Sequence, residues 1–343
     1  MVLVGHLMSW LGIFPFVQPP YVPYLQGIGV VLFFILSGFV IPYSTSVKFN
    51  SKGSYTFKEY FIDRFARIYS SYLPCLLMIF LLDISLIQFT EETYNYHDGF
   101  DLKTFFANIF MLQDFPLNGY LSFFDLTSFG SGRPLWTLAV EWWIYFWFGF
   151  TYLVIIKQKR TNLITLGVFL LFSIVPYFNF IAGRGDGLML PWLLGCLVLI
   201  LLPVVQGFNL NKYFIFLLLI LLSIMIYKRY LNTEFKYVEF YYVCLLAVVV
   251  LLLIVLFSKI NFGLRAKKLI NFLADYSFTL YLLHYTVLNI LISLFAKSVN
   301  PYLLFAAGLI LPNLLSMAVA YFTEMRYRTF RIFLKAKFLK SNK

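Results

Sequence analysis

The stretch YFIDRFARIYSSYLPCLLMIFLL, residues 60–82, joins a basic segment to an apolar run. Arg64 and Arg67 stand three residues apart, and no charged side chain follows between Leu73 and Leu82. A helix needs about 20 mainly apolar residues to cross the roughly 30 Å hydrocarbon core of a membrane. The stretch therefore predicts a membrane-spanning helix, over residues 68–88, with two permanent cations at its entrance.

The composition of the whole chain agrees with a membrane protein. Only 12% of its 343 residues are charged, 61% are hydrophobic, and the mean hydropathy is +0.83. A soluble domain has about 25% charged residues. The sequence lacks the alternating pattern of a barrel, so helices must span the lipid. We predict an all-α integral membrane protein in which residues 1–343 form a single transmembrane domain, with no fused soluble domain.

The apolar runs predict about ten spans. Their residue ranges are 1–17, 24–43, 68–88, 135–156, 163–182, 187–205, 213–230, 239–257, 276–296 and 302–322. With a cytoplasmic N-terminus, the inside loops and the tail hold twenty lysines and arginines, and the outside loops hold seven. Cytoplasmic loops are enriched in these residues. This bias places both termini in the cytoplasm and explains the net charge of +12 without a nucleic-acid partner.

The first run is weaker than the others. As a helix, residues 1–17 reach only about 25 Å, and Gly5, Ser9 and Gly12 dilute their apolar character. No basic cluster precedes the run, so it does not resemble a signal peptide. We expect the natural protein to begin further upstream.

Two histidines, His6 and His284, fall inside predicted spans. Ionisable groups are costly in lipid and usually face the interior of the helix bundle. Each histidine is either hydrogen-bonded between helices or functional. His6 has small neighbours that suit a cavity wall, and histidine is the usual general base near neutral pH. With only three histidines and no acidic pair at ligand spacing, no metal site is predicted.

Other polar residues at apolar positions also allow two interpretations. Arg64 and Arg67 are either lipid anchors or a clamp for phosphate, which the planar guanidinium group suits. Glu141 lies in LWTLAVEWWIYFWFGF, residues 135–150, and either forms a structural ion pair or positions a catalytic site. Ser37 precedes Gly38 in GVVLFFILSGFVI, residues 29–41, where small residues permit close helix contact.

Five motifs, in order, resemble the acyltransferase-3 family of membrane O-acyltransferases, which acetylate bacterial surface sugars. They are His6, VVLFFILSGFVI, DRFARIYSSYLP, LWTLAVEWWIYF and YSFTLYLLHYTVL (residues 276–288), and they extend over nearly the whole chain. The resemblance implies an acyl-CoA-dependent O-acyltransferase in the bacterial plasma membrane. Its acyl donor would be acetyl-CoA, bound from the cytoplasm, and its acceptor a surface polysaccharide or a lipid-linked sugar.

The resemblance also implies roles for residues of this chain. It assigns catalysis to His6 and Glu141, and donor binding to Arg64, Arg67 and Tyr69. Four residues are expected to support the site or contact substrate: Ser37, Trp136, Tyr281 and His284. Membrane lipids are expected partners. Some family members carry a C-terminal periplasmic esterase-like domain, whereas this sequence ends in a basic tail, so we expect it to act alone or with a separate periplasmic partner.

Several points stay open at the level of sequence. The family usually has a Leu-Asp-Gly-Leu-Arg segment before the first histidine, and only five residues precede His6 here. His6 can act either as a general base or as a nucleophile that carries the acyl group. A transporter or flippase of a lipid-linked sugar is the alternative function, although the sequence shows no inverted repeat. A catalytically inactive subunit is the third reading.

Overall fold

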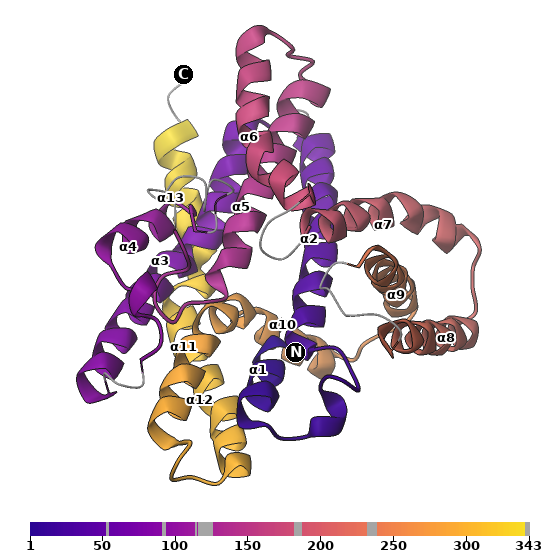
Figure 1. Ribbon diagram of the computed structural model, residues 1–343. Coiled ribbons are helices and arrows are strands. Elements are labelled where there is room, and N and C mark those ends of the chain that lie inside the picture. The colour runs from indigo at the N-terminus through magenta and orange to yellow at the C-terminus, as the bar shows by residue number, and fades with distance from the viewer. Residues whose placement is uncertain are drawn as a thin grey trace. The chain divides into compact units, whose positions relative to one another are not determined.

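The structure is a computed structural model in which every regular element of the described residues is a helix (Figure 1). It describes residues 1–52, 55–90, 94–113, 115, 126–181, 187–231 and 239–339. The prediction of an all-helical chain is confirmed for these ranges.

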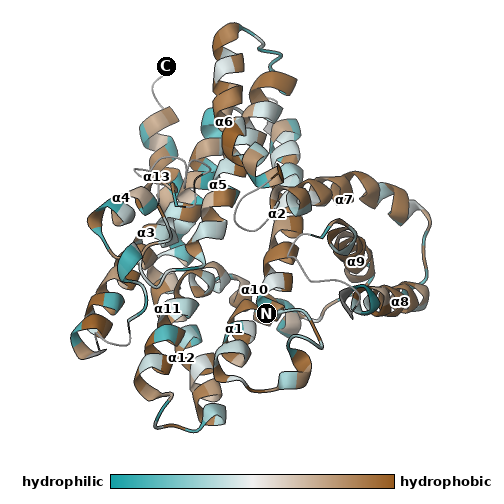
Figure 2. Ribbon diagram, viewed as in Figure 1, coloured by the Kyte–Doolittle hydropathy of each residue, from teal (hydrophilic) through white to brown (hydrophobic). Residues whose placement is uncertain are grey.

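Eight of the described helices are long and apolar enough to cross a membrane. They are Leu25–Ser51, Phe57–Phe89, Leu135–Lys157, Leu163–Ile181, Met189–Gly207, Phe240–Ser258, Ser277–Phe295 and Pro301–Leu339. They coincide with eight of the ten predicted spans. The other two predicted spans fall on α1 (Val2–Leu11), a short apolar helix, and on α8 (Lys212–Leu231), which is not among the eight. Figure 2 shows that α9 and most of α8 are hydrophobic, whereas α8 has basic residues at its ends.

The chain folds into two compact units that alternate along the sequence. The first unit contains Met1–Gly5, Phe14–Ser54 and Pro176–Lys267, and the second contains His6–Ile13, Tyr55–Val175 and Lys268–Lys343. Three helices have residues in both units, namely α1, α6 (Leu163–Ile181) and α10 (Leu264–Ala274). That the whole chain forms one functional domain remains a prediction.

The first unit is built around the contact between α2 and α7. Its helices are α2 (Leu25–Lys52), α7 (Met189–Gly207), α8 and α9 (Phe240–Ser258), after the short turn η1 (Pro15–Val17). A Cβ atom on Gly38 of α2 would lie 1.9 Å from the carbonyl oxygen of Trp192. A Cβ atom on Gly195 of α7 would lie 2.1 Å from the carbonyl oxygen of Ile35. Two glycines therefore let the backbones meet, as the small residues around Ser37 predicted.

The second unit contains the longest helix, α3, and the C-terminal helices. Its elements are α3 (Phe57–Thr90), η3 (His97–Gly99), α4 (Leu102–Ile109), α5 (Leu135–Phe150), η5 (Thr151–Lys157), α11 (Ser277–Phe295), α12 (Pro301–Phe322), η6 (Glu324–Arg326) and α13 (Tyr327–Leu339). Helix α11 packs along α12 and against α3, and α13 packs on α3 (Figure 1). Ile62, Ala66 and Leu334 form the core of the α3–α13 contact.

Helix α1 is shorter than predicted. The sequence predicted a helical span over residues 1–17, but the helix ends at Leu11. Gly12 has a φ of +62°, a left-handed conformation that commonly ends a helix. Pro15 then begins the separate turn η1. Ten residues give a helix of about 15 Å, half of what a membrane crossing requires.

Helix α3 begins earlier than predicted, so Arg64 and Arg67 lie within it rather than ahead of it. Thr56 and Glu59 form a capping box at its start: the backbone N–H of Thr56 donates to Glu59 Oε2 (2.9 Å), and that of Glu59 donates to Thr56 Oγ1 (3.2 Å). Such a box satisfies donors that the helix leaves unpaired. The apolar run, residues 68–88, predicted only the hydrophobic part of α3, which begins at Phe57. Of the predicted outside loop 89–134, residues 91–93, 114 and 116–125 lie outside the described part.

Candidate active site

Helices α1 and α11 bring His6 and His284 together. The two imidazole rings stack, with centroids 5.6 Å apart and planes inclined by 29°. The side chains differ in burial: His284 is 1% exposed, whereas His6 is only partly buried. The pair therefore has one deeply buried member and one partly exposed member.

Hydrogen bonds to the backbone fix the orientation of His284. Its Nδ1 lies 2.8 Å from the carbonyl oxygen of Tyr281 and 3.2 Å from that of Leu280. Carbonyl oxygens only accept, so Nδ1 carries a hydrogen and donates it. In the neutral ring, Nε2 then has a lone pair. Nε2 is buried and has no hydrogen-bond partner among the described residues, so this acceptor remains available inside the bundle.

Aromatic rings surround His6. The ring centroid of Tyr285 is 5.1 Å away, edge-on, and that of Trp10 is 5.9 Å away. Trp10 and Tyr285 also contact each other, at 4.5 Å. The hydroxyl of Tyr96 donates to that of Tyr285 (3.3 Å). Burial, together with this hydrogen bond, raises the pKa of Tyr96 above its ordinary value, so its hydroxyl stays protonated.

A cation, Arg133, lies on the far side of Tyr96. Its guanidinium carbon is 5.3 Å from the centre of the Tyr96 ring, and its Nη1 donates to Thr127 Oγ1 (3.0 Å). No carboxylate of the described residues pairs with it. Arg133 is therefore a cation that is separated from His6 by two tyrosine rings, Tyr96 and Tyr285, and that can still bind an anionic or polar group.

A buried network holds the loop that carries Arg133. The carboxylate of Asp83 on α3 accepts from the backbone N–H of Ser131 (2.7 Å), the Ser131 hydroxyl (2.6 Å) and the Tyr94 hydroxyl (2.9 Å). The hydroxyls of Ser131 and Thr286 are also hydrogen-bonded, at 2.8 Å. Asp83 and Thr286 are fully buried. The network fixes the loop to α3 and to α11 close to His284.

Tyr281 ties the start of α5 to α11. Its hydroxyl lies 2.5 Å from Thr137 Oγ1 and donates to the carbonyl oxygen of Pro134 at 3.3 Å. Its backbone carbonyl accepts from His284. Trp136 precedes Thr137 in the first turn of α5 and is partly buried. Tyr281 thus supports both the histidine and the motif that contains Glu141.

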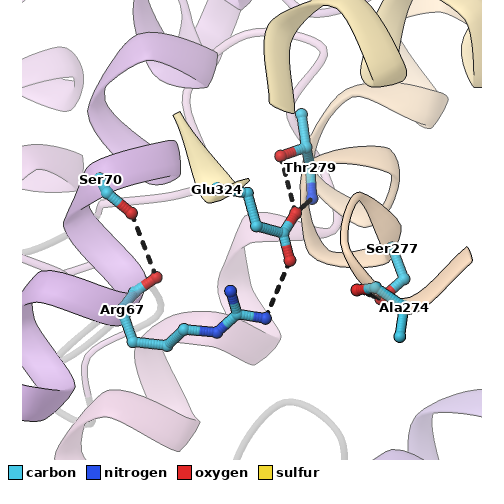
Figure 3. A network of polar contacts seen from close by, with 6 residues as sticks. All are labelled: Arg67, Ser70, Ala274, Ser277, Thr279 and Glu324. Carbon is cyan, nitrogen blue, oxygen red and sulfur yellow. Dashed lines mark hydrogen bonds and ion pairs between the residues drawn. The ribbon is translucent and has the colours of Figure 1, made fainter. Parts of the chain in front are cut away.

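Arg67 is held by Glu324. Its Nη2 lies 2.9 Å from Glu324 Oε1, and Glu324 Oε2 accepts from the backbone N–H and the hydroxyl of Thr279, both at 2.9 Å (Figure 3). The Glu324 side chain is 0% exposed and that of Arg67 is 37% exposed. The carboxylate satisfies a donor in the first turn of α11, which a helix leaves without an internal partner. Arg67 is thereby coupled to α11.

Arg64 has a different environment from Arg67. Its guanidinium carbon lies 5.7 Å from the centre of the Tyr60 ring, and its buried Nε has no hydrogen-bond partner among the described residues. Tyr69, predicted to bind the donor, donates its hydroxyl to the carbonyl oxygen of Ile109 (2.9 Å) and stacks on Phe65. Of these residues, Arg64 has the larger unused capacity for a ligand.

Glu141 lies between the histidine pair and the arginines. It is 3% exposed and accepts a hydrogen bond from the Tyr145 hydroxyl, one turn further along α5. Thr137, which contacts Tyr281, is one turn earlier, a rise of about 6 Å. Tyr60, over whose ring Arg64 lies, donates its hydroxyl to the carbonyl oxygen of Tyr145 (3.1 Å). Helix α5 thus connects Glu141, through Tyr145, to the residue that Arg64 contacts.

Helix α11 sets the spacing between the two polar clusters. Thr279, which binds Glu324 and through it Arg67, is five residues from His284. Five residues correspond to about 7.5 Å of helix rise. The arginine cluster and the histidine pair are thus neighbours along one rigid helix.

Sequence reasoning did not identify every residue at this site. It found His6 and His284, but not Trp10, Arg133 or Glu324. The signal for Arg133 was a lone cation directly before the apolar helix α5, and that for Glu324 was a lone carboxylate directly after α12. Ser37 lies in the first unit, buried beside Gly38 at the α2–α7 contact, and its predicted role remains a prediction.

The described part of the chain contains no group of three or more His, Cys, Asp or Glu side chains that could hold a metal ion. The predicted roles of the histidines, the arginines and Glu141 remain predictions.

Comparison with known proteins agrees with the motifs. The family model described as "Acyltransferase domain", Acyl_transf_3, matches residues 1–321. No curated protein and no solved structure matches the chain. The match extends over α1 to α12 and so includes both histidines, Arg64, Arg67 and Glu141. The chain belongs to the acyltransferase-3 family.

Proposed function

We propose that this protein moves an acyl group, most simply acetyl, from cytoplasmic acyl-CoA to a hydroxyl of a surface polysaccharide or a lipid-linked sugar. The observation that carries the proposal is the histidine pair: His6 is accessible, and the unpartnered Nε2 of His284 lies in the ring stacked on it. Membership of the family supports acyl transfer. The donor, the acceptor and the residue roles belong to the proposal.

In the proposed reaction, the acceptor hydroxyl oxygen attacks the carbonyl carbon of the thioester. A C–O ester bond forms and the C–S bond breaks. His6 takes the hydroxyl proton as general base and returns it to the departing thiolate. His284, whose ring stacks on that of His6, would position the His6 imidazole for this step. A covalent acyl-histidine is the second form of this proposal, and release of one equivalent of CoA without acceptor would reveal it.

The donor is proposed to bind at the arginines. Arg64 and Arg67 lie one turn apart on α3, and guanidinium groups bind phosphate oxygens in pairs of hydrogen bonds. A pantetheine arm would enter past Arg67 and run along α11 toward His284 and His6. Glu141 would then stabilise the tyrosines that line this path.

The acceptor is proposed to bind on the opposite side of His6. Trp10 and Tyr285 offer flat faces to a sugar ring, and Arg133 lies beyond Tyr96. The multi-pass helices place the protein in a membrane. We propose the bacterial plasma membrane, with both termini in the cytoplasm and the acceptor side outside, where a separate periplasmic protein could continue the transfer.

The proposal is tested with the purified chain in lipid nanodiscs, supplied with acetyl-CoA and oligosaccharides from a bacterial surface polysaccharide. We expect free CoA thiol to appear only with acceptor, in equal amount to acetyl ester detected on the sugar by mass spectrometry. If the protein instead moved a lipid-linked sugar across a vesicle membrane without releasing CoA, the proposed acyltransferase function would be wrong and a transporter function would be supported.

A further inference from the structure

The second unit also contains a cavity with basic residues in its lining. This cavity, of about 780 Å³, lies where the starts of α3 and α6, the end of η5 and the end of α13 meet. Neither Arg64, nor Arg67, nor either histidine of the pair lines it. The cavity therefore belongs to neither the proposed donor site nor the histidine pair.

The charged groups of this cavity are both positive. Lys58 and Arg160 line it, and no lining residue is acidic. Neither side chain forms an ion pair with a carboxylate of the described chain. Two cations that share a cavity without a counter-ion attract an anion of the surrounding medium.

A strained turn brings Arg160 to the cavity. The π-helix η5 ends at Lys157, and the backbone N–H of Arg160 folds back to the carbonyl oxygen of Val154 (3.2 Å). Lys159 has a φ of +53°, a left-handed conformation that costs energy for a residue with a side chain. Such local strain, like a π-helix, often marks a functional site. Here its effect is to place a second cation beside Lys58.

The cavity's threonines are already hydrogen-bonded. Thr56 and Glu59 bond each other at the start of α3. At the start of α6, Asn162 Oδ1 accepts from the backbone N–H (2.9 Å) and the hydroxyl (2.8 Å) of Thr165. The polar side chains of the lining that remain for a ligand are Lys58, Arg160 and the amide of Gln158, of which two are positively charged.

The remaining wall is apolar and continues onto a surface that suits lipid. Phe150, Val154 and Val168 line the cavity, as does Ile164, which is 78% exposed. Leu163, just before it, is 84% exposed. Helix α6 is one of the eight membrane-spanning candidates. An anion that binds here therefore has an apolar path from the cations to the lipid-facing side of α6.

We propose that this cavity binds one anionic phospholipid. Its phosphate would pair with Lys58 and Arg160, and an acyl chain would lie along Ile164 and Val168. Basic pockets between membrane helices on the cytoplasmic side typically bind lipid head groups. The acyl donor also carries phosphates, but the apolar exit toward lipid favours a molecule whose tail remains in the bilayer. This inference does not depend on the proposed acyltransferase function.

The test is native mass spectrometry of the purified full chain, titrated with phosphatidylglycerol or with phosphatidylcholine of the same acyl chains. We expect at least tenfold tighter binding of one phosphatidylglycerol to the parent protein. The preference should fall to less than twofold in the double variant Lys58→Gln/Arg160→Gln. It should persist in Lys58→Arg/Arg160→Lys, which keeps both charges, and in the control Lys212→Gln/Lys297→Gln, which removes two exposed cations outside the cavity.

Three results would overturn the proposal. The first is no preference for phosphatidylglycerol in the parent protein, and the second is an equal loss in the control variant. The third is displacement of the bound lipid by CoA, which would assign the cavity to the donor nucleotide instead. Because the readout is lipid binding, failure of acyl transfer would leave the lipid result intact. Equal Tm values of the variants confirm that each is folded.

Discussion

Arg64 and Arg67 of α3 make different contacts, although they are only three residues apart in the sequence. Arg67 binds the buried carboxylate of Glu324, which also caps α11 through Thr279. Arg64 makes a ring contact with Tyr60 and retains an unpartnered Nε. Removing one partner of a buried ion pair is costly because the other charge is left uncompensated. We therefore expect Arg67 to contribute to the stability of the folded protein and Arg64 to contribute mainly to binding of the acyl donor.

Arg64→Gln should raise the KM for the acyl donor at least tenfold and leave the Tm unchanged. Arg67→Gln should also weaken donor binding, and it should destabilise the protein by about 1–3 kcal/mol, because the buried Glu324 loses a partner that is itself partly exposed. Adding Glu324→Gln to Arg67→Gln should recover part of that stability, because the buried charge is then gone. Donor titrations and thermal unfolding in detergent measure both effects. If Arg64→Gln and the parent protein bound the donor with equal affinity, the proposal that Arg64 binds the donor phosphates would be wrong.

Arg133 should act on the acceptor. A charge-assisted hydrogen bond contributes about 1.5–3 kcal/mol, so Arg133→Gln should lower kcat/KM for the sugar by about 10- to 100-fold. The KM for the donor should stay the same. Arg133→Lys keeps the charge and should restore part of the loss. Steady-state kinetics with each substrate varied in turn would decide; a change confined to the donor would contradict the position of Arg133 on the acceptor side.

Part of this site was predictable from residue type alone. A histidine in an apolar run is costly and therefore conspicuous, which is how His6 and His284 were found. Arg133 and Glu324 lie near helix ends, where charged residues are common, so the lone charge that marks each of them was too weak a signal to identify it. Their roles depend on tertiary contacts, with Tyr96 and with Arg67 and Thr279, that no local pattern encodes.

At the scale of elements, apolar runs predicted where helices meet lipid but not where they begin. Helix α3 starts eleven residues before the predicted span, at the Thr56–Glu59 capping box, because hydrogen bonds at helix ends do not require apolar side chains. Helix α1 stops at Gly12, within an apolar run, because the backbone reverses there. Both errors follow from using hydropathy as the signal for helix length.

The close contact between helices α2 and α7 can be tested by substituting its glycine. Gly38→Ala would drive a methyl group to within 1.9 Å of the Trp192 carbonyl oxygen, and overpacking costs about 1–3 kcal/mol. A methyl group on Gly167 in α6 would have open space around it, with no neighbouring atom within 4 Å. Gly167→Ala should therefore stabilise the protein, by up to about 1 kcal/mol, through helix propensity. Thermal unfolding of the two variants should shift the Tm in opposite directions. A Gly38→Ala variant with an unchanged Tm would contradict the close contact between the two helices.

At the scale of the whole molecule, the sequence sufficed for the class and family but not for the internal organisation. The low charge and the apolar runs identify a helical membrane protein, and the ordered motifs identify the family. The division into two interleaved units was not predictable, since it depends on which helices pack together. Helix α11 illustrates this, because it joins the arginine cluster to the histidine pair only once α3 and α12 are packed against it.

The central claim is that the His6–His284 pair carries out acyl transfer to a surface sugar. The most direct test is the O-acetyl content of surface polysaccharide, by mass spectrometry, in cells that hold equal membrane levels of the parent chain, His6→Ala or the control His97→Ala, which alters an exposed histidine. We predict acetylation with the parent and with His97→Ala, and none with His6→Ala. Unchanged acetylation in His6→Ala would contradict the account.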